Sequence, residues 1–242
     1  MTRILLLSFI IGLTTLHSEA QMGDFMGRIG IQGKCKLTKK LSVDVGVQSR
    51  MNFSTKTYSS TNFSLEGAYR LSKSIKVGLA YRNLIQPNEY PLLDNKAMAY
   101  RNRFQADLRF LPSRWLKLDK YISLELRTLF QYEHFKFQRN QVYWRNRFLL
   151  KPVLKNEQIQ PYASAELLYR FNQEAYFVGD ELVTQGLMNE LRYTVGIEYN
   201  LNKNNAIDVG CMFRDFRTSK PTNVVLLVTY VHDFNQLFPA KK

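Results

Sequence analysis

The sequence is poor in the residues that build metal centres, disulfide scaffolds and membrane helices. It contains 2 cysteines and 3 histidines in 242 residues. A metal site needs several Cys, His or carboxylate ligands that converge on one point, and the sequence offers no such grouping. Beyond residue 20 no stretch approaches the ~18 consecutive apolar residues of a membrane helix. These shortages argue against a metalloprotein, a disulfide-rich scaffold and a helical membrane protein.

The one long apolar run lies at the N-terminus. "ILLLSFIIGL" (4–13) follows a weakly basic start, and "SEA" (18–20) gives the small-x-small pattern that signal peptidase cuts. Such a run is too short for a membrane helix, which needs about 20 residues. A buried core helix is the alternative interpretation. We therefore predict a cleavable signal peptide at residues 1–20 and a single mature domain at residues 21–242.

The mature chain alternates between apolar and polar residues. From Phe25 to Leu37 the odd positions are apolar or small, and the even positions are polar from Arg28 onward. A period of two held over about a dozen residues indicates a β-strand, because a helix would scramble it. The same alternation predicts eleven strands in all, at 25–37, 41–53, 61–71, 75–85, 98–110, 121–133, 142–154, 158–171, 188–201, 206–217 and 222–234.

Strand length separates the two architectures that share this alternation. A soluble β-sandwich or lipocalin-like barrel has strands of about 5–6 residues, whereas a tilted membrane strand needs about 9–11. Nearly every predicted strand has eleven residues or more. Short turns also alternate with longer loops near 86–97, 134–141 and 172–187, as on the two sides of an outer-membrane barrel. We predict an all-β fold, a single antiparallel transmembrane β-barrel of about 10–12 strands.

Aromatic residues on the apolar face agree with a membrane location. They gather toward both ends of the predicted strands, as expected of side chains at the two membrane interfaces. Ten lie toward the long loops (Phe53, Phe63, Tyr81, Tyr100, Phe130, Tyr132, Trp144, Tyr169, Phe171 and Phe213) and four toward the short turns (Phe110, Tyr199, Tyr230 and Phe234). The last strand, "VVLLVTYVHDF", ends on an aromatic residue like many assembly signals of outer-membrane proteins. We therefore expect the barrel assembly machinery as a partner.

The count of eleven conflicts with the even strand numbers of bacterial single-chain barrels. If the C-terminus is periplasmic, the strand at 25–37 begins at the outer surface. Residues 21–24 reach only about 14 Å when extended, which is too short to cross the membrane. Either one strand is split or missed, or the short turns face outward.

Several segments carry a resemblance to a known family. These are "RIGIQGKCKLTKKLSVDVGVQSR" (28–50), "YRNRF" (100–104), the hairpin "NRFLLKPVL…IQPYASAELLYRFN" and the hairpin "LRYTVGIEYNLNKNNAIDVGCMFR" (191–214). They resemble the Bacteroidota-type outer-membrane barrels known as a domain of unknown function, the DUF2490-like family. The resemblance covers essentially the whole mature chain. The resemblance implies a barrel fold, but it implies no reaction and no substrate.

An arginine motif occurs twice, as "YRNRF" (100–104) and "WRNRF" (144–148). The alternation turns Arg101, Arg103, Arg145 and Arg147 inward, and the strand between them sends Glu133 inward. Antiparallel pairing would place Glu133 level with both arginine pairs, giving an Arg–Glu–Arg ladder across three strands. Cross-strand pairs of opposite charge stabilise a sheet by about 0.2–1 kcal/mol each, so a structural role is sufficient for the motif.

Further inward arginines keep a functional role open. We predict an Arg/Glu-lined lumen near the long loops, formed by Arg50, Arg82, Arg101, Arg103, Glu133, Arg145, Arg147, Arg170, Glu190, Arg192 and Arg214. Basic rings select anions in pores, but a barrel of this size has a narrow lumen that long side chains can fill. The choice lies between a narrow anion-leaning pore and a closed structural or accessory barrel.

We expect no enzymatic activity, and no cofactor or metal. His134 and His232 have no serine or carboxylate at a spacing that would place both on one strand face. A lipid-modifying outer-membrane enzyme remains the least favoured alternative. The net charge of +14 fits contact with lipopolysaccharide phosphates and outer-membrane lipid rather than nucleic acid. A protein partner is left open, and the expected location is the outer membrane of a Gram-negative bacterium.

Cys35 and Cys211 are expected to be free thiols. They lie on predicted strands that should not be neighbours, and strands two apart in a sheet are separated by about 9–10 Å. A disulfide needs Cα atoms within about 7 Å.

The mature protein should begin at Gln21 and fractionate with outer membranes. A closed barrel resists unfolding by detergent at room temperature, so its gel mobility should change only after boiling. N-terminal sequencing, membrane fractionation and paired gels check this. Recovery as a soluble periplasmic protein would contradict the barrel assignment.

Overall fold

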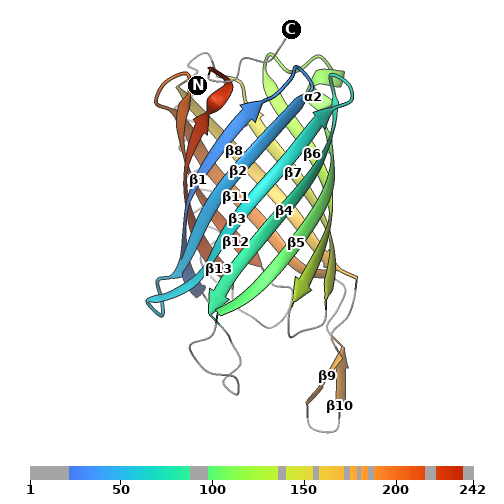
Figure 1. Cartoon of the computed structure of the whole chain (residues 1–242), viewed down its shortest axis with the longest axis vertical. Coiled ribbons are helices and arrows are strands. Elements are labelled where there is room, and N and C mark those ends of the chain that lie inside the picture. Colours follow the sequence, from blue (N-terminus) through green and yellow to red (C-terminus); the bar gives the residue numbers. More distant parts are fainter. Residues whose placement is uncertain are drawn as a thin grey trace.

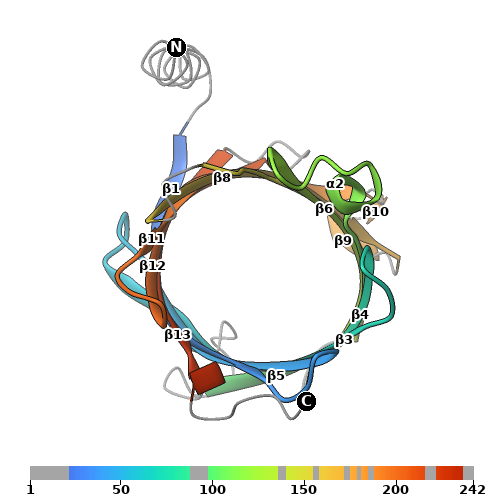
Figure 2. The ribbon, with the colours of Figure 1, turned by 90° about the horizontal axis from the view of Figure 1, so that it is seen from above.

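The computed structural model describes residues 22–87, 98–135, 140–154, 158–171, 175–178, 181–184, 188–215 and 222–236. The predicted signal peptide lies outside these residues. Eleven strands close into one barrel, in the order β1-β13-β12-β11-β8-β7-β6-β5-β4-β3-β2, and form a single ring of strands when viewed end-on (Figures 1 and 2). The strands are β1 (Met22–Lys36), β2 (Leu41–Asn52), β3 (Thr57–Arg70), β4 (Ile75–Pro87), β5 (Met98–Phe110), β6 (Ile122–Phe135), β7 (Gln141–Pro152), β8 (Ile159–Arg170), β11 (Met188–Asn200), β12 (Asn205–Asp215) and β13 (Thr222–Asp233).

All eleven predicted strands are confirmed. Four short elements gave no signal in the alternation: the strands β9 (Ala175–Val178) and β10 (Glu181–Thr184) of one hairpin, the helix α2 (Pro112–Trp115) and the 3-10 turn η1 (Phe234–Gln236). Each has three or four residues, too few to establish a period. No helix in the described ranges is long and apolar enough to cross a membrane.

The seam between β1 and β13 explains the odd strand number. Ten of the eleven neighbouring pairs are antiparallel. β1 and β13 instead run parallel, in one register from Phe25 opposite Val224 to Lys34 opposite Asp233. When strands alternate in direction, the first and last of eleven point the same way, so only a parallel pair can close the ring. No predicted strand is split or missing, and β1 begins beside the start of β13 at the long-loop end.

The outer face of the barrel is apolar and open. Leu79 in the middle of β4 is 70% exposed, and Ile31 in the middle of β1 is 63% exposed. Water-soluble proteins rarely expose contiguous apolar areas of this extent, whereas the lipid-facing band of an outer-membrane barrel does so throughout. Aromatic rings pack against one another on this face near the long loops, in the pairs Phe25–Phe53, Tyr81–Phe104, Phe130–Trp144 and Trp144–Tyr169. The molecule is a closed β-barrel of the outer-membrane type.

Both cysteines are free thiols, as predicted. Cys35 lies on β1 and Cys211 on β12, and β13 runs between these two strands.

Candidate functional site

The polar side chains of the strands face inward and pair across neighbouring strands. On β5, Arg103 lies opposite Glu133 of β6, and their side chains form an ion pair of 2.6 Å. Gln131 donates a hydrogen bond of 2.5 Å from Nε2 to Oε1 of Glu133. Gln105 donates in turn from Nε2 to Oε1 of Gln131, at 2.6 Å. Glu133 is only 3% exposed, so its charge depends on these partners rather than on water.

The prediction that Glu133 also lies level with the arginines of the second motif is wrong. Glu133 lies opposite Gln141 at the start of β7, while Arg145 lies opposite Leu129. The two arginines of the second motif therefore take other carboxylates: Arg145 pairs with Glu166 of β8 at 2.7 Å, and Arg147 pairs with Glu125 of β6 at 2.9 Å. The register of β6 against β7 is the physical reason, because it places Arg145 four residues beyond the level of Glu133.

An ion-pair network continues from Arg145 over the neighbouring strands. Arg192 of β11 bridges Glu166 at 3.2 Å and Glu190 at 2.7 Å. Glu190 also binds Nε of Arg214 on β12 at 2.5 Å. A hydrogen bond of 2.9 Å from Arg145 Nη1 to Gln131 joins this part to the Arg103–Glu133 pair. We call this chain of contacts, which covers β5, β6, β7, β8, β11 and β12, the paired network.

A second cluster lies closer to the short turns. Arg109 of β5 binds Asp107 at 2.7 Å and also binds Glu66 of β3, and Arg127 of β6 binds the same two carboxylates at 2.7 and 3.3 Å. These contacts pass over β4 at Gly78, which lies opposite Asp107. A Cβ atom at Gly78 would lie 2.5 Å from Asp107 Oδ2. A side chain at Gly78 would therefore displace the Asp107 carboxylate, which binds Arg109 and Arg127.

Carboxylates are more numerous on the inner face than the sequence analysis counted. Glu166 was missed, and Glu125, which the alternation turned inward, was left out of the count. Together they neutralise arginines that were counted as an excess over Glu133 and Glu190. Of the other predicted residues, Arg101 lies on the inner face of β5, and Arg170 lies with its guanidinium carbon 5.7 Å from the ring centre of Tyr143.

Cross-strand pairing links a set of inner side chains around the barrel. Asn62 faces Leu84, Arg145 faces Leu168, and Met212 faces Val225. Following the pairs around the ring gives the inner belt: Met26, Arg28, Arg50, Ser60, Asn62, Leu84, Arg101, Arg103, Leu129, Gln131, Glu133, Arg145, Leu168, Glu190, Arg192, Met212, Arg214 and Val225.

The inner belt lies toward the long loops and is tightly packed. Five of its apolar members, Leu84, Leu129, Leu168, Met212 and Val225, are between 2% and 7% exposed. Two small polar members on β3, Ser60 and Asn62, are 4% and 6% exposed. These side chains are packed against their neighbours, whereas the arginines of the belt are half-buried.

Four inward arginines stand apart from the ion pairs. In the described part of the chain no side-chain hydrogen bond or ion pair is found for Arg28, Arg50, Arg70 or Arg82, and the Nε atom of each is buried without a partner. Arg70 lies at the short-turn end of β3, away from the other three. Arg28 lies directly opposite Arg50, and Arg82 lies directly opposite Arg103. The β1–β4 side of the lumen thus concentrates positive charge that the protein's own carboxylates do not neutralise.

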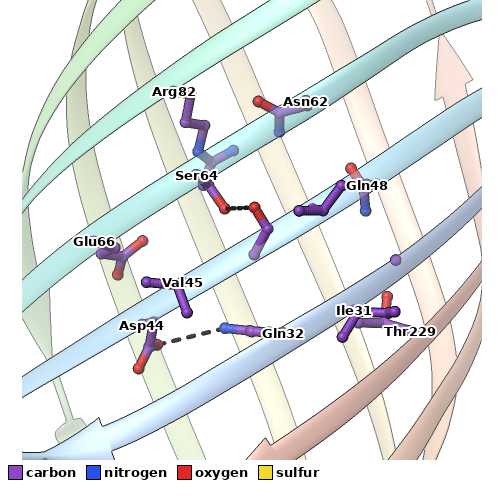
Figure 3. Close-up of a pocket in the computed structure, with 13 residues that line it drawn as sticks. Ile31, Gln32, Asp44, Val45, Gln48, Asn62, Ser64, Glu66, Arg82 and Thr229 are labelled. Carbon is purple, nitrogen blue, oxygen red and sulfur yellow. Dashed lines mark hydrogen bonds between the residues drawn. The ribbon is translucent and has the colours of Figure 1, made fainter.

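A recess of about 170 Å³ lies on the inner wall of the barrel and includes Arg82 in its lining (Figure 3). It follows β1, β2 and β3 and is lined by Gly30, Ile31, Gln32, Asp44, Val45, Gly46, Val47, Gln48, Asn62, Ser64, Glu66, Arg82 and Thr229. The described residues contain no group of three or more His, Cys, Asp or Glu side chains that could hold a metal ion. The polar groups that line the recess are the side-chain amides, the hydroxyls of Ser64 and Thr229, the guanidinium group of Arg82, and the carboxylates of Asp44 and Glu66.

Comparison with known proteins identifies the family. Residues 29–225 match the model of the family described as "Protein of unknown function (DUF2490)". The chain belongs to this family. No curated protein matches the sequence.

Solved structures similar to this DUF2490 protein include the translocator domain of the autotransporter NalP from Neisseria meningitidis. The TM-score is 0.41 at 10% sequence identity, over 79% of this chain and 73% of that one. So distant a likeness carries no functional information.

Replacing Glu190 by glutamine should destabilise the barrel strongly. The side chain of Glu190 is 6% exposed and neutralises both Arg192 and Arg214, and breaking a buried ion pair from one side costs about 3–5 kcal/mol. Equilibrium unfolding by urea of the refolded protein, followed on unboiled gels, measures the change.

The matched control is Glu198→Gln. Glu198 pairs with Lys151 at 3.0 Å, but both side chains are 25% exposed, so the loss should stay near the ~0–1 kcal/mol of solvent-accessible pairs. Equal losses in the two variants would show that the paired network has no special role in stability.

Proposed function

We propose that this DUF2490 protein is a closed barrel of the Gram-negative outer membrane, with a structural or accessory role and no enzymatic activity. The burial of the inner belt carries the proposal. Leu84, Leu129 and Leu168 project inward at the same level as the paired network, and each is at most 7% exposed. A lumen filled by interleaved apolar and ion-paired side chains leaves no continuous water path for a solute.

Two further features support the membrane setting of the proposal. The outer face exposes large apolar residues along whole strands, which suits lipid and not water. Basic residues are in excess, with a net charge of +14, which suits contact with the phosphates of lipopolysaccharide. The proposed partners are therefore outer-membrane lipid, lipopolysaccharide and the barrel assembly machinery.

A narrow anion-leaning pore is the second candidate. Arg28, Arg50 and Arg82 favour it, because arginine side chains without carboxylate partners attract anions into a lumen. The two candidates differ in one measurable property, the conductance of the purified protein in a planar lipid bilayer.

The wild-type protein should show no channel events in such a bilayer. The double variant Leu84→Ala and Leu168→Ala removes two inner-belt side chains from β4 and β8, so stepwise conductance should appear. The matched control, Leu79→Ala with Leu65→Ala, removes the same atoms from the outer face and should stay silent. Gel mobility before and after boiling shows that each variant is folded.

Steady anion-selective conductance of the wild-type protein would contradict the closed barrel. In that case Arg103→Glu with Arg147→Glu should reverse or abolish the anion preference, because charges at a narrow constriction act at short range where screening is weak. In a closed barrel the same pair of substitutions lowers thermal stability, since it puts like charges beside Glu133 and Glu125.

A further inference from the structure

We propose that Arg28, Arg50 and Arg82 form a binding site for a small oxyanion of the phosphate type, at the recess on the inner wall of β1–β3. The first observation is that the buried Nε atom of each of these arginines has no acceptor within the described residues. Buried polar groups in proteins are nearly always hydrogen-bonded, and an unpaired buried charge is strongly unfavourable. An external anion supplies the acceptors that are missing here.

The contrast with the other side of the barrel supports this assignment. Arg103, Arg145, Arg192 and Arg214 belong to the inner belt, and each has a built-in carboxylate within 3.2 Å. Around Arg28 and Arg50 the belt offers Ser60, Asn62 and Met26 instead. The carboxylates of the recess, Asp44 and Glu66, lie farther along the strands toward the short turns.

The local backbone leaves room for a ligand. Gly30 and Gly46 lie in the wall of the recess, one strand apart, and Ser64 follows on β3. A Cβ atom at Gly46 would lie 2.9 Å from Ser64 Oγ, so a larger residue would fill the space. Arg28 and Arg50 lie two residues from Gly30 and Gln48 on the same inner face, and Arg82 lines the recess itself (Figure 3).

Size and chemistry define the ligand class. A volume of about 170 Å³ is smaller than the ~300–1,000 Å³ of pockets for drug-sized ligands, which suits a phosphate-sized ion. The planar guanidinium fork matches the oxygens of phosphate, and the amides of Gln48 and Asn62 can donate further hydrogen bonds. The two carboxylates of the recess are already engaged within the protein, since Asp44 accepts a hydrogen bond from Gln32 and Glu66 binds Arg109 and Arg127.

The source of the anion is the aqueous phase. The recess is on the inner face of the wall, so lipid headgroups on the outer face do not reach it, and its volume does not admit a glycerol-linked lipid. The site does not depend on the closed lumen proposed above. It would bind its ion equally in a conducting barrel, so a channel-forming result leaves this inference intact.

Titration of the refolded full mature chain with inorganic phosphate tests the site. The ionic strength is kept constant with chloride as the balancing anion. In titration calorimetry phosphate should bind saturably, and it should raise the midpoint temperature of thermal unfolding of the protein. Arg50→Gln and Arg82→Gln should each weaken binding about tenfold, the effect of losing one charged hydrogen bond. Arg70→Gln is the matched control, because it removes the same charge from the inner face of β3 about 20 Å away.

Stability without phosphate gives a second readout. Arg50→Gln removes an unpaired charge beside Arg28, so in phosphate-free buffer this variant should unfold no earlier than the wild type. In saturating phosphate the order should reverse. Absence of saturable phosphate binding in the wild type, or equal weakening by the Arg70→Gln control, would overturn the proposal.

Discussion

Backbone hydrogen bonding in lipid is the constraint on which this structure depends. A strand inside a bilayer cannot leave its N–H and C=O groups unpaired, so a sheet that crosses the membrane must close on itself. This chain supplies eleven long strands, and their alternating directions bring β1 and β13 together pointing the same way. The parallel seam is thus a consequence of the strand number. Closure then fixes which side chains face lipid and which face the lumen.

The lumen contains two electrostatic environments that a simple count of charges does not separate. From β5 to β12, the arginines of the paired network are each bound by Glu133, Glu166 or Glu190. On β1 and β2, Arg28 and Arg50 have no such partners in the described part of the chain, and the carboxylates Asp44 and Glu66 lie farther toward the short turns. The first environment rigidifies and fills the barrel, whereas the second has the properties of a ligand site. Both belong to the same inner belt.

The sequence reveals the faces of the strands better than the contacts between them. Alternation depends only on residues two apart, so it correctly predicts eleven strands and turns residues such as Arg103 and Glu133 inward. Register depends on where each strand begins relative to its neighbour, which alternation does not encode. For this reason the pairing of Glu133 with Arg145 was wrong, and the crossing of β4 at Gly78 was not foreseen. The inward direction of Glu166 could have been predicted, because the alternation along its strand already places it on the inner face.

The most direct test of this account is a cysteine cross-link across the β1–β13 seam. Met26 and Val225 are partners in the parallel register, and adjacent strands lie about 4.8 Å apart, within reach of a disulfide. In a chain with Cys35 and Cys211 replaced by serine, Met26→Cys with Val225→Cys should oxidise to an intramolecular disulfide in the assembled barrel. Met26→Cys with Val231→Cys, whose positions lie about 20 Å apart along the strand, should remain reduced. Cross-linking of the second pair, or of neither, would contradict the parallel closure and the inner belt that follows from it.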